Sequence, residues 1–308
     1  AVYPLASLAD DAPKRAVRSA FAMQAFLQTH GEQVTRYGTF TFMAKIGIGF
    51  GPVEWGLVGS NAYKTFYFDG AGVQDCLRAE QHAGRGEIIA STALQPHIAD
   101  YTSGTSRAEM TVLTEQRVTL DDQPLVPPQD NHSVARDFIL DAVLDLKVSG
   151  EFREIANVFI SFYPADRAAL DQFTTQIMTL CNQYGGYFRH LDIGDKGPVI
   201  VVLFGAPTTY ENNTQRAAEF ALALKNTVSN IRWSVGLTFG TVYAGMIGGD
   251  QRADYAAVGD VVNLAARIMS KTPANAVWVS GQAVQQLMGD FALLPQGEQR
   301  FKGKTGVV

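Results

Sequence analysis

Two polar residues in the second half of the sequence are spaced so that they could act on one ligand. Asn263 and Arg267 are four positions apart in residues 255–269, YAAVGDVVNLAARIM, whose apolar residues recur at helical spacing. Residues four apart lie on one face of a helix, so the two side chains would project together. An asparagine amide can hold a ribose oxygen, and an arginine fork suits a phosphate. A solvated helix face would show the same spacing, so the pattern alone leaves both interpretations open.

An internal repeat surrounds these residues. Residues 46–59, IGIGFGPVEWGLVG, match residues 235–248, VGLTFGTVYAGMIG, at a constant offset of 189 positions. The offset continues without a gap to Ser91 and Ser280. A match of this length predicts two copies of one domain. The first copy is expected to be incomplete, because about 45 residues that open the second copy have no counterpart in this sequence.

Residue patterns predict the elements that position Asn263 and Arg267. Alternating or β-branched runs predict strands at 157–163, 199–204 and 276–279. Helical spacing predicts helices at 167–184, 211–225 and 260–270, the second with a twin at 12–29. Residues 231–239 and 241–247 alternate about Gly240 and are predicted to form a hairpin.

The order of these elements indicates the fold class. The order β-α-β-β-α-β is typical of a ferredoxin-like fold, which mixes α and β elements in an α+β arrangement. We expect a first domain at 1–118 without its N-terminal strands, a proline-rich linker at 119–151 and a second domain at 152–308.

The composition restricts the class of protein. The 308 residues are 46% hydrophobic and 18% charged, which is enough apolar material for packed cores. The net charge of −5 argues against a nucleic-acid partner. Two cysteines are too few for a disulfide framework, and no apolar run is long enough to span a membrane. We therefore expect a cytoplasmic protein without a membrane partner.

The segment 259–267, GDVVNLAAR, preceded by GLTFGTVYAGMIG, resembles the signature of class III nucleotidyl cyclases. The resemblance extends over both copies. Tandem copies, together with residues 195–207, DKGPVIVVLFGAP, are similar to the soluble, bicarbonate-responsive type of adenylyl cyclase. The resemblance implies two cyclase homology domains related by a pseudo-twofold axis, which form an intramolecular pseudo-dimer with two clefts.

The resemblance also implies a reaction, the conversion of ATP to 3′,5′-cyclic AMP and pyrophosphate. In this family two aspartates of one domain hold two Mg²⁺ or Mn²⁺ ions, while the partner domain supplies an asparagine and an arginine. Carried over to this sequence, Asn263 orients the ribose and Arg267 stabilises the phosphate in the transition state. Ser161 occupies the metal position of the second copy. The aspartates for the other cleft are expected before Ala1, so no metal ligand is predicted in this sequence.

The first copy departs from the family at the equivalent helix. Gln74 stands opposite Asn263, whereas Arg78 stands opposite Arg267. This cleft is therefore expected to be inactive and to serve as a regulatory pocket. A partly buried Arg78 without a substrate would bind a small anion such as bicarbonate.

The positions that the family uses for the purine base also depart from its pattern. Ala256 occupies the position three before the glycine that opens the helix, where the family has a polar side chain. His190 or Lys196 could replace the family's base-contacting lysine. These departures leave a second hypothesis open, a catalytically degenerate pair of cyclase homology domains that senses a nucleotide or another small molecule.

Overall fold

The computed structural model describes residues 2–3, 11–60, 63–117, 136–146, 149–194, 197–227, 231–249 and 252–301. The chain divides into two compact units. Unit 1 comprises Ala1–Trp55 and Phe68–Gln129, and unit 2 comprises Gly56–Tyr67 and Asp130–Val308. A short segment of the first repeat, Gly56–Tyr67, therefore packs with the second unit. No helix in the described ranges combines the length and the apolar character needed to cross a bilayer.

Unit 1 is built on a four-stranded sheet of order β3-β6-β8-β7. Its elements are α1 (Ala12–His30), β1 (Glu32–Thr35), β2 (Gly38–Thr41), β3 (Ile46–Ile48), α2 (Ala71–His82), β6 (Ile88–Ala90), the 3₁₀ helix η1 (Gln95–His97), β7 (Thr102–Arg107) and β8 (Met110–Gln116). Strands β4 (Glu54–Gly59) and β5 (Lys64–Asp69) begin or end in unit 1 and continue into unit 2. Apolar residues of α1, such as Val17 and Ala20, pack against the sheet residues Ile48, Ile88 and Ala90.

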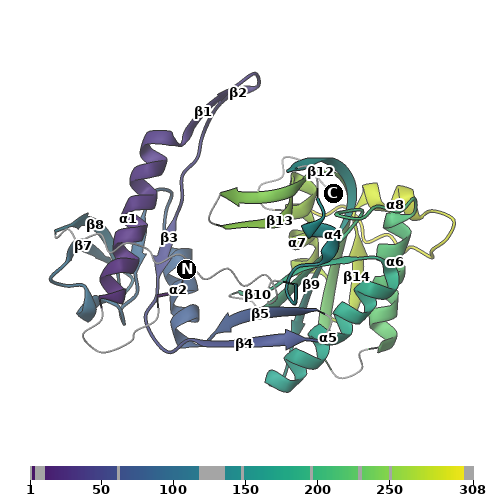
Figure 1. Cartoon of the computed structure of the whole chain (residues 1–308), viewed down its shortest axis with the longest axis horizontal. Helices are drawn as coiled ribbons and strands as arrows, with labels where there is room; N and C mark the ends of the chain where they lie inside the picture. Colours follow the sequence, from purple (N-terminus) through teal and green to yellow (C-terminus); the bar gives the residue numbers. More distant parts are fainter. Residues whose placement is uncertain are drawn as a thin grey trace. The chain divides into compact units, whose positions relative to one another are not determined.

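The β1–β2 hairpin is an addition to the first copy of the repeat. It lies between α1 and β3, where the second copy has only residues 228–231 between the corresponding helix and strand. Every residue of both strands is exposed. The hairpin extends away from α1 (Figure 1) and contributes nothing to the core of unit 1.

Unit 2 contains the longer sheet, of order β10-β11-β9-β12-β13, with β14 paired in parallel to β12. Its elements are α4 (Asp141–Leu144), β9 (Gly150–Tyr163), α5 (Arg167–Tyr184), β10 (Tyr187–Gly194), β11 (Gly197–Phe204), α6 (Asn213–Thr227), β12 (Arg232–Gly249), β13 (Arg252–Val258), α7 (Asp260–Lys271), β14 (Ala276–Val279) and α8 (Gly281–Leu287). These elements form a mixed α+β fold, as the sequence pattern predicts.

The two faces of this sheet have different coverings. On one face, Val158, Ile160 and Phe162 of β9 pack against apolar residues of α5, α6 and α8. Successive strand residues point to opposite faces, so Phe159 and Ser161 lie on the other face. Helix α7 packs on that second face, against β12 and β9. The sheet of unit 2 is thereby enclosed between helices (Figure 1).

The sheet of unit 2 curls so that its two antiparallel edges meet. Strands β10 and β13 stand at opposite ends of the strand order. Nevertheless the Arg189 guanidinium of β10 lies 3.2 Å from the Asp254 carboxylate of β13. The rings of Tyr187 and Tyr255 also meet edge to face, with centroids 5.5 Å apart. Side chains from strands far apart in the sheet are thus brought to one place.

The repeat recurs in three dimensions as a β-α-β segment with identical register. A Cβ at Gly47 would overlap the backbone of α2 at Cys76 and Glu80, and a Cβ at Gly236 would overlap the backbone of α7 at Ala265 and Met269. All these positions differ by the repeat offset of 189. The amides of Ser91 and Ser280 donate to the equivalent carbonyls of Ile48 and Leu237, each at 2.9 Å. The same glycine therefore allows the same close helix-on-strand packing in both units.

Most of the elements expected from sequence are confirmed. The helices at 167–184 and 260–270 and the strand at 276–279 match α5, α7 and β14 within one residue. Strand β9 begins at Gly150, earlier than expected, and α4 lies within the predicted linker. Of that linker, residues 119–135 and 147–148 lie outside the described residues.

The hairpin predicted about Gly240 is wrong. Strand β12 runs without a turn from Arg232 to Gly249, and Gly240 pairs with Ile155 of β9 within it. A Cβ at Gly240 would lie 2.8 Å from a side-chain methyl of Val261. The glycine is therefore needed for the approach of α7, and the hairpin partner of β12 is β13.

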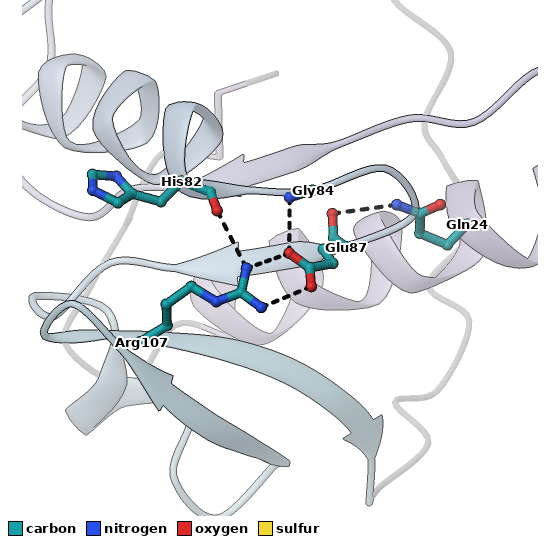
Figure 2. A network of polar contacts seen from close by, with 5 residues as sticks. All are labelled: Gln24, His82, Gly84, Glu87 and Arg107. Atoms are coloured by element: carbon teal, nitrogen blue, oxygen red, sulfur yellow. Dashed lines mark hydrogen bonds and ion pairs between the residues drawn. The ribbon is translucent and has the colours of Figure 1, made fainter.

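A polar network ties four parts of unit 1 together (Figure 2). The Arg107 guanidinium of β7 donates to both carboxylate oxygens of Glu87, at 2.5 and 2.9 Å, and Glu87 also accepts from the Gly84 amide at 2.8 Å. Arg107 further donates to the carbonyl of His82 at the end of α2, and Gln24 of α1 donates to the Glu87 carbonyl. The hydrogen bonds from Arg107 and Gly84 lower the pKa of Glu87 to about 2.

We predict that Glu87→Gln lowers the free energy of unfolding at neutral pH. The difference in free energy of unfolding between this variant and wild type should become smaller in acid. Because the pKa of Glu87 is depressed in the folded protein, the contribution of its carboxylate to the free energy of unfolding is fully present above the ordinary pKa of 4.5. That contribution is lost as the pH falls toward about 2. Urea unfolding followed by circular dichroism at a series of pH values measures this difference. Glu115→Gln, which removes a carboxylate bonded to the Ser103 hydroxyl, is the control. A Glu87→Gln effect independent of pH would contradict the prediction.

Candidate functional site

Helix α7 carries the two residues singled out by the sequence and is held tightly on the sheet. It begins after Gly259 and buries Leu264, Ala265 and Ile268. The Thr238 hydroxyl of β12 donates to the Val261 carbonyl at 2.8 Å. Together with the backbone contact at Gly236, these interactions fix both the position and the rotation of the helix.

Asn263 and Arg267 project from this fixed helix one turn apart. Asn263 is exposed, and Arg267 is half-buried. The Nη1 atom of Arg267 is buried and has no hydrogen-bond partner among the described residues. Guanidinium groups remain charged at all ordinary pH values, so a buried N–H without an acceptor is costly. An incoming anion with oxygen acceptors would satisfy it.

His190 lies at the curled edge of the sheet. It is half-buried in β10, directly after a break in the register between β10 and β11. Its ring contacts the Arg189 guanidinium. Burial and the positive charge of Arg189 lower the pKa of His190 to about 4, so the imidazole is neutral at pH 7. A neutral imidazole can both donate and accept one hydrogen bond.

Ala256 lies in β13, which stands at the other end of the strand order from β10, the strand of His190. It is buried and pairs with Gly245 of β12. Two residues earlier, the Asp254 carboxylate forms the ion pair with Arg189. The Arg189–Asp254 pair thus links the neighbourhoods of His190 and Ala256, and the chain continues from β13 through Gly259 into α7.

The predicted site residues that the structure describes are linked only through neighbours, by the Arg189–Asp254 ion pair between the strands of His190 and Ala256. The His190 neighbourhood and β13 are joined as described, whereas no hydrogen bond or ion pair between described residues joins them to Asn263 or Arg267. Lys196 lies outside the described residues.

Gln74 and Arg78 lie on α2 in unit 1 and both have partners. The Gln74 amide donates to the Asp69 carboxylate at 3.3 Å, and Arg78 pairs with Asp75 of its own helix at 2.8 Å. The Arg78 side chain is 63% exposed. The expectation that Arg78 is partly buried is therefore wrong, and Asp75, one helical turn away, already pairs with its guanidinium.

A metal ion does not fit the described residues. They contain no group of three histidine, cysteine, aspartate or glutamate side chains that could hold one. Ser161 is buried in β9, paired with Val199 and Ser234 on the neighbouring strands. Asp192 of β10 is exposed.

The sequence did not identify Arg189, Asp254 or the tyrosines around them. Two charged residues within largely apolar strands were the available signal. Their pairing depends on the curl of the sheet, which local patterns do not encode.

Comparison with known families gives a match to the second part of the chain. Residues 159–308 match the sequence model of the "Adenylate and Guanylate cyclase catalytic domain". The matched region contains α7 with Asn263 and Arg267, and also β10 and β13. This part of the chain is thus similar to the catalytic domains of adenylate and guanylate cyclases.

Individual relatives agree with this match. A Mycobacterium tuberculosis (strain H37Rv) protein named "Adenylate cyclase" is 30% identical over 150 residues, which cover 46% of this chain and 33% of the relative. The Rhizobium meliloti "Adenylate cyclase 1" is 22% identical over 174 residues, covering 50% of this chain and 26% of the relative. The chain thus spans about a third or less of the length of these relatives.

Solved structures of nucleotidyl cyclases are similar to half of the chain. The adenylyl cyclase CyaB from P. aeruginosa is 19% identical with a TM-score of 0.47, covering 52% of this chain and 93% of that chain. The catalytic core of a rhodopsin-guanylyl cyclase with converted specificity, in complex with ATPalphaS, is 23% identical with a TM-score of 0.43, covering 52% of this chain and 95% of that chain.

We predict that Gly236→Ala destabilises unit 2 by about 1–3 kcal/mol, because the added methyl must push the α7 backbone off β12. Gly281→Ala is the matched control, since a Cβ at Gly281 meets nothing within 4 Å. Urea unfolding of both variants measures the difference. Equal stability of Gly236→Ala and wild type would show that α7 is not held by this contact.

Proposed function

We propose that the chain acts as an adenylyl cyclase, which converts ATP to 3′,5′-cyclic AMP and pyrophosphate. The observation that carries the proposal is the buried Nη1 atom of Arg267, which lacks a hydrogen-bond partner among the described residues. A phosphate offers charged oxygen acceptors, which the planar fork of a guanidinium prefers. Exposed Asn263, one turn earlier on the same helix, is available to the ribose of the same molecule.

The chemistry assigned to these two residues follows from where charge develops. The 3′-hydroxyl oxygen of the ribose attacks the α-phosphorus, the bond from that phosphorus to the pyrophosphate oxygen breaks, and the hydroxyl proton is released. Negative charge grows on the phosphate oxygens and the leaving pyrophosphate as this bond lengthens. Arg267 stabilises that charge, and Asn263 holds the ribose so that its hydroxyl faces the phosphorus.

His190 and Ala256 are assigned to the side of the purine base. Because the Arg189 guanidinium can only donate to the His190 ring, the N–H of neutral His190 is free to donate to a ring nitrogen of the base, whereas Ala256 offers no side-chain hydrogen bond. Lys196 stays in the proposal as an alternative to His190. The relatives named adenylate cyclase favour ATP over GTP as the substrate.

The proposed reaction includes divalent cations, although the described residues contain no site for them. Two Mg²⁺ or Mn²⁺ ions are expected from the family, but the described side chains do not fit such a site. The steps assigned above therefore concern this chain's own residues.

The tandem, pseudo-twofold architecture of the soluble, bicarbonate-responsive type is also part of the proposal. The shared register of Gly47 with α2 and of Gly236 with α7 supports two copies of one domain. A regulatory pocket at Gln74 and Arg78 has weaker support, because Arg78 is exposed and paired with Asp75. A bicarbonate response lost in Arg78→Ala would support that pocket.

One observation favours the second candidate function, a nucleotide-sensing module without catalysis. Ser161 is buried at the β9 position where the family resemblance implies a metal-binding aspartate. A hydroxyl cannot replace a carboxylate as a strong magnesium ligand. The sensing function requires nucleotide binding without a cyclic product.

We predict that Arg267→Ala lowers kcat about 10²–10³-fold and changes KM far less, because the arginine acts mainly on charge that appears in the transition state. Arg267→Lys keeps the charge but loses the fork and should recover activity only in part. Asn263→Ala should also lower kcat, because the ribose loses its orientation. The assay measures cyclic AMP and cyclic GMP from ATP and GTP with Mg²⁺ or Mn²⁺, in the protein at its natural full length.

The control for charge is Lys225→Ala, which removes an exposed cation from the last turn of α6. Full turnover in Arg267→Ala would overturn the assignment of α7 to the reaction. Nucleotide binding by wild type without either cyclic product would favour the sensing module.

A further inference from the structure

The segment Gly56–Tyr67 belongs to the first repeat by sequence but packs inside unit 2, and we call it the tongue. Both of its ends continue directly into unit 1, at Trp55 and Phe68. Val58, Tyr63 and Tyr67 are buried in the main apolar core of unit 2. The tongue is therefore a structural part of unit 2 that is supplied by the first half of the sequence.

Polar contacts hold the tongue in place. The Gly59 amide donates to the Asp171 carboxylate of α5 at 3.0 Å. The Lys64 amide donates to the Asp137 carbonyl at 2.7 Å, and the Lys64 ammonium pairs with the Asp137 carboxylate at 2.8 Å. The Arg167 guanidinium lies over the Tyr67 ring, 5.8 Å from its centre. Contacts at both strands of the tongue fix its position on α5.

The repeat shows that the burial of Val58 is specific to the tongue. Residues 245–256 are its counterpart at the offset of 189. Val58 of the tongue is 2% exposed, whereas the equivalent Ile247 is 38% exposed. This hairpin position is thus buried in one copy and open in the other, so the repeat by itself does not require Val58 to be buried.

Tyr63 connects the tongue to the strand that carries His190. Its hydroxyl donates to the Phe188 carbonyl of β10 at 3.3 Å, and its ring meets the Phe188 ring with centroids 6.0 Å apart. The register of β10 breaks between Phe188 and His190. The Tyr63 hydroxyl therefore holds the carbonyl at the start of this irregularity, where the backbone sets the direction of the next side chains.

Arg189, which lies within the break in register of β10, contacts residues of the candidate site. Arg189 contacts the His190 ring and pairs with Asp254 of β13. Burial and the nearby Asp254 carboxylate raise the pKa of Tyr63, and burial and Tyr63 raise the pKa of Tyr187. Both phenols therefore stay protonated at neutral pH, and Tyr63 remains a hydrogen-bond donor.

We propose that Tyr63 is a positioning residue for nucleotide binding, which acts by fixing the β10 backbone that presents Arg189 and His190. This inference rests on the proposed function, in which His190 lies on the side of the purine base. It adds that the first half of the chain sets the shape of a binding site in the second half. The ligand concerned is a purine nucleoside triphosphate.

The test compares Tyr63→Phe with Tyr67→Phe in the protein at its natural full length. Tyr63→Phe removes only the hydroxyl that reaches β10, and Tyr67→Phe removes a hydroxyl from the same segment. We expect Tyr63→Phe to raise KM for ATP about five-fold with kcat within about two-fold of wild type, because the lost hydrogen bond affects binding of substrate and transition state alike. Tyr67→Phe should leave both constants unchanged. Equal KM values in Tyr63→Phe and wild type would overturn the proposal.

A double variant separates positioning from a general loss of stability. If Tyr63 acts through the β10 irregularity, Tyr63→Phe should raise KM much less in an Arg189→Ala background than in wild type. A merely structural tyrosine would raise KM by the same factor in both backgrounds, which would count against the proposal. Circular dichroism of each variant checks that it is folded.

The experiment distinguishes failure of the proposed function from failure of the positioning role. A wild-type protein that binds ATP but forms no cyclic nucleotide would refute the cyclase, and the Kd for ATP then replaces KM in the same comparison. A five-fold weaker Kd in Tyr63→Phe would still support the positioning role, and an unchanged Kd would overturn it. A wild-type protein that binds neither ATP nor GTP would overturn both.

Discussion

The close packing of α7 on β12 is the constraint on which the candidate site depends. At Gly236 the helix backbone lies where any side chain of the strand would stand, so only glycine is compatible with this position. Such a contact removes the freedom of the helix to slide or rotate. Burial of Leu264, Ala265 and Ile268 stabilises the helix and offsets the cost of the buried Arg267 Nη1 atom, which has no hydrogen-bond partner in the part of the chain that the structure describes.

The candidate site also depends on the curl of the unit 2 sheet, which brings β10 and β13 together. Strand β12 is long enough to pair with β9 over most of its length and to fold its end, with β13, back toward β10. The Arg189–Asp254 pair and the Tyr187–Tyr255 contact stabilise that closure. The same enclosure desolvates His190 and places it beside a guanidinium, so the imidazole is neutral. The fold thus sets the hydrogen-bonding capacity of this side chain.

The division into units explains why the two halves of the chain are not independent. The core of unit 2 includes Val58, Tyr63 and Tyr67, which precede the rest of that unit by many residues. Removing the first half would expose apolar surface on α5 and leave the Phe188 carbonyl without its donor. The family match at residues 159–308 does not include this segment, so the matched region alone is not the whole of unit 2.

Local patterns were sufficient to determine α5, α7, β14 and the repeat, because helical periodicity and glycine spacing are properties of neighbouring residues. They also identified Asn263 and Arg267 as a pair on one helix face. They could not distinguish a turn at Gly240 from a glycine required by the approach of α7, since both uses of glycine look alike in sequence. The neutrality of His190, the contact of β10 with β13 and the burial of the tongue depended on the tertiary structure. Each of these features arises because the path of the backbone brings together side chains that are far apart in the sequence, or shields a side chain from solvent. Local spacing does not specify that path.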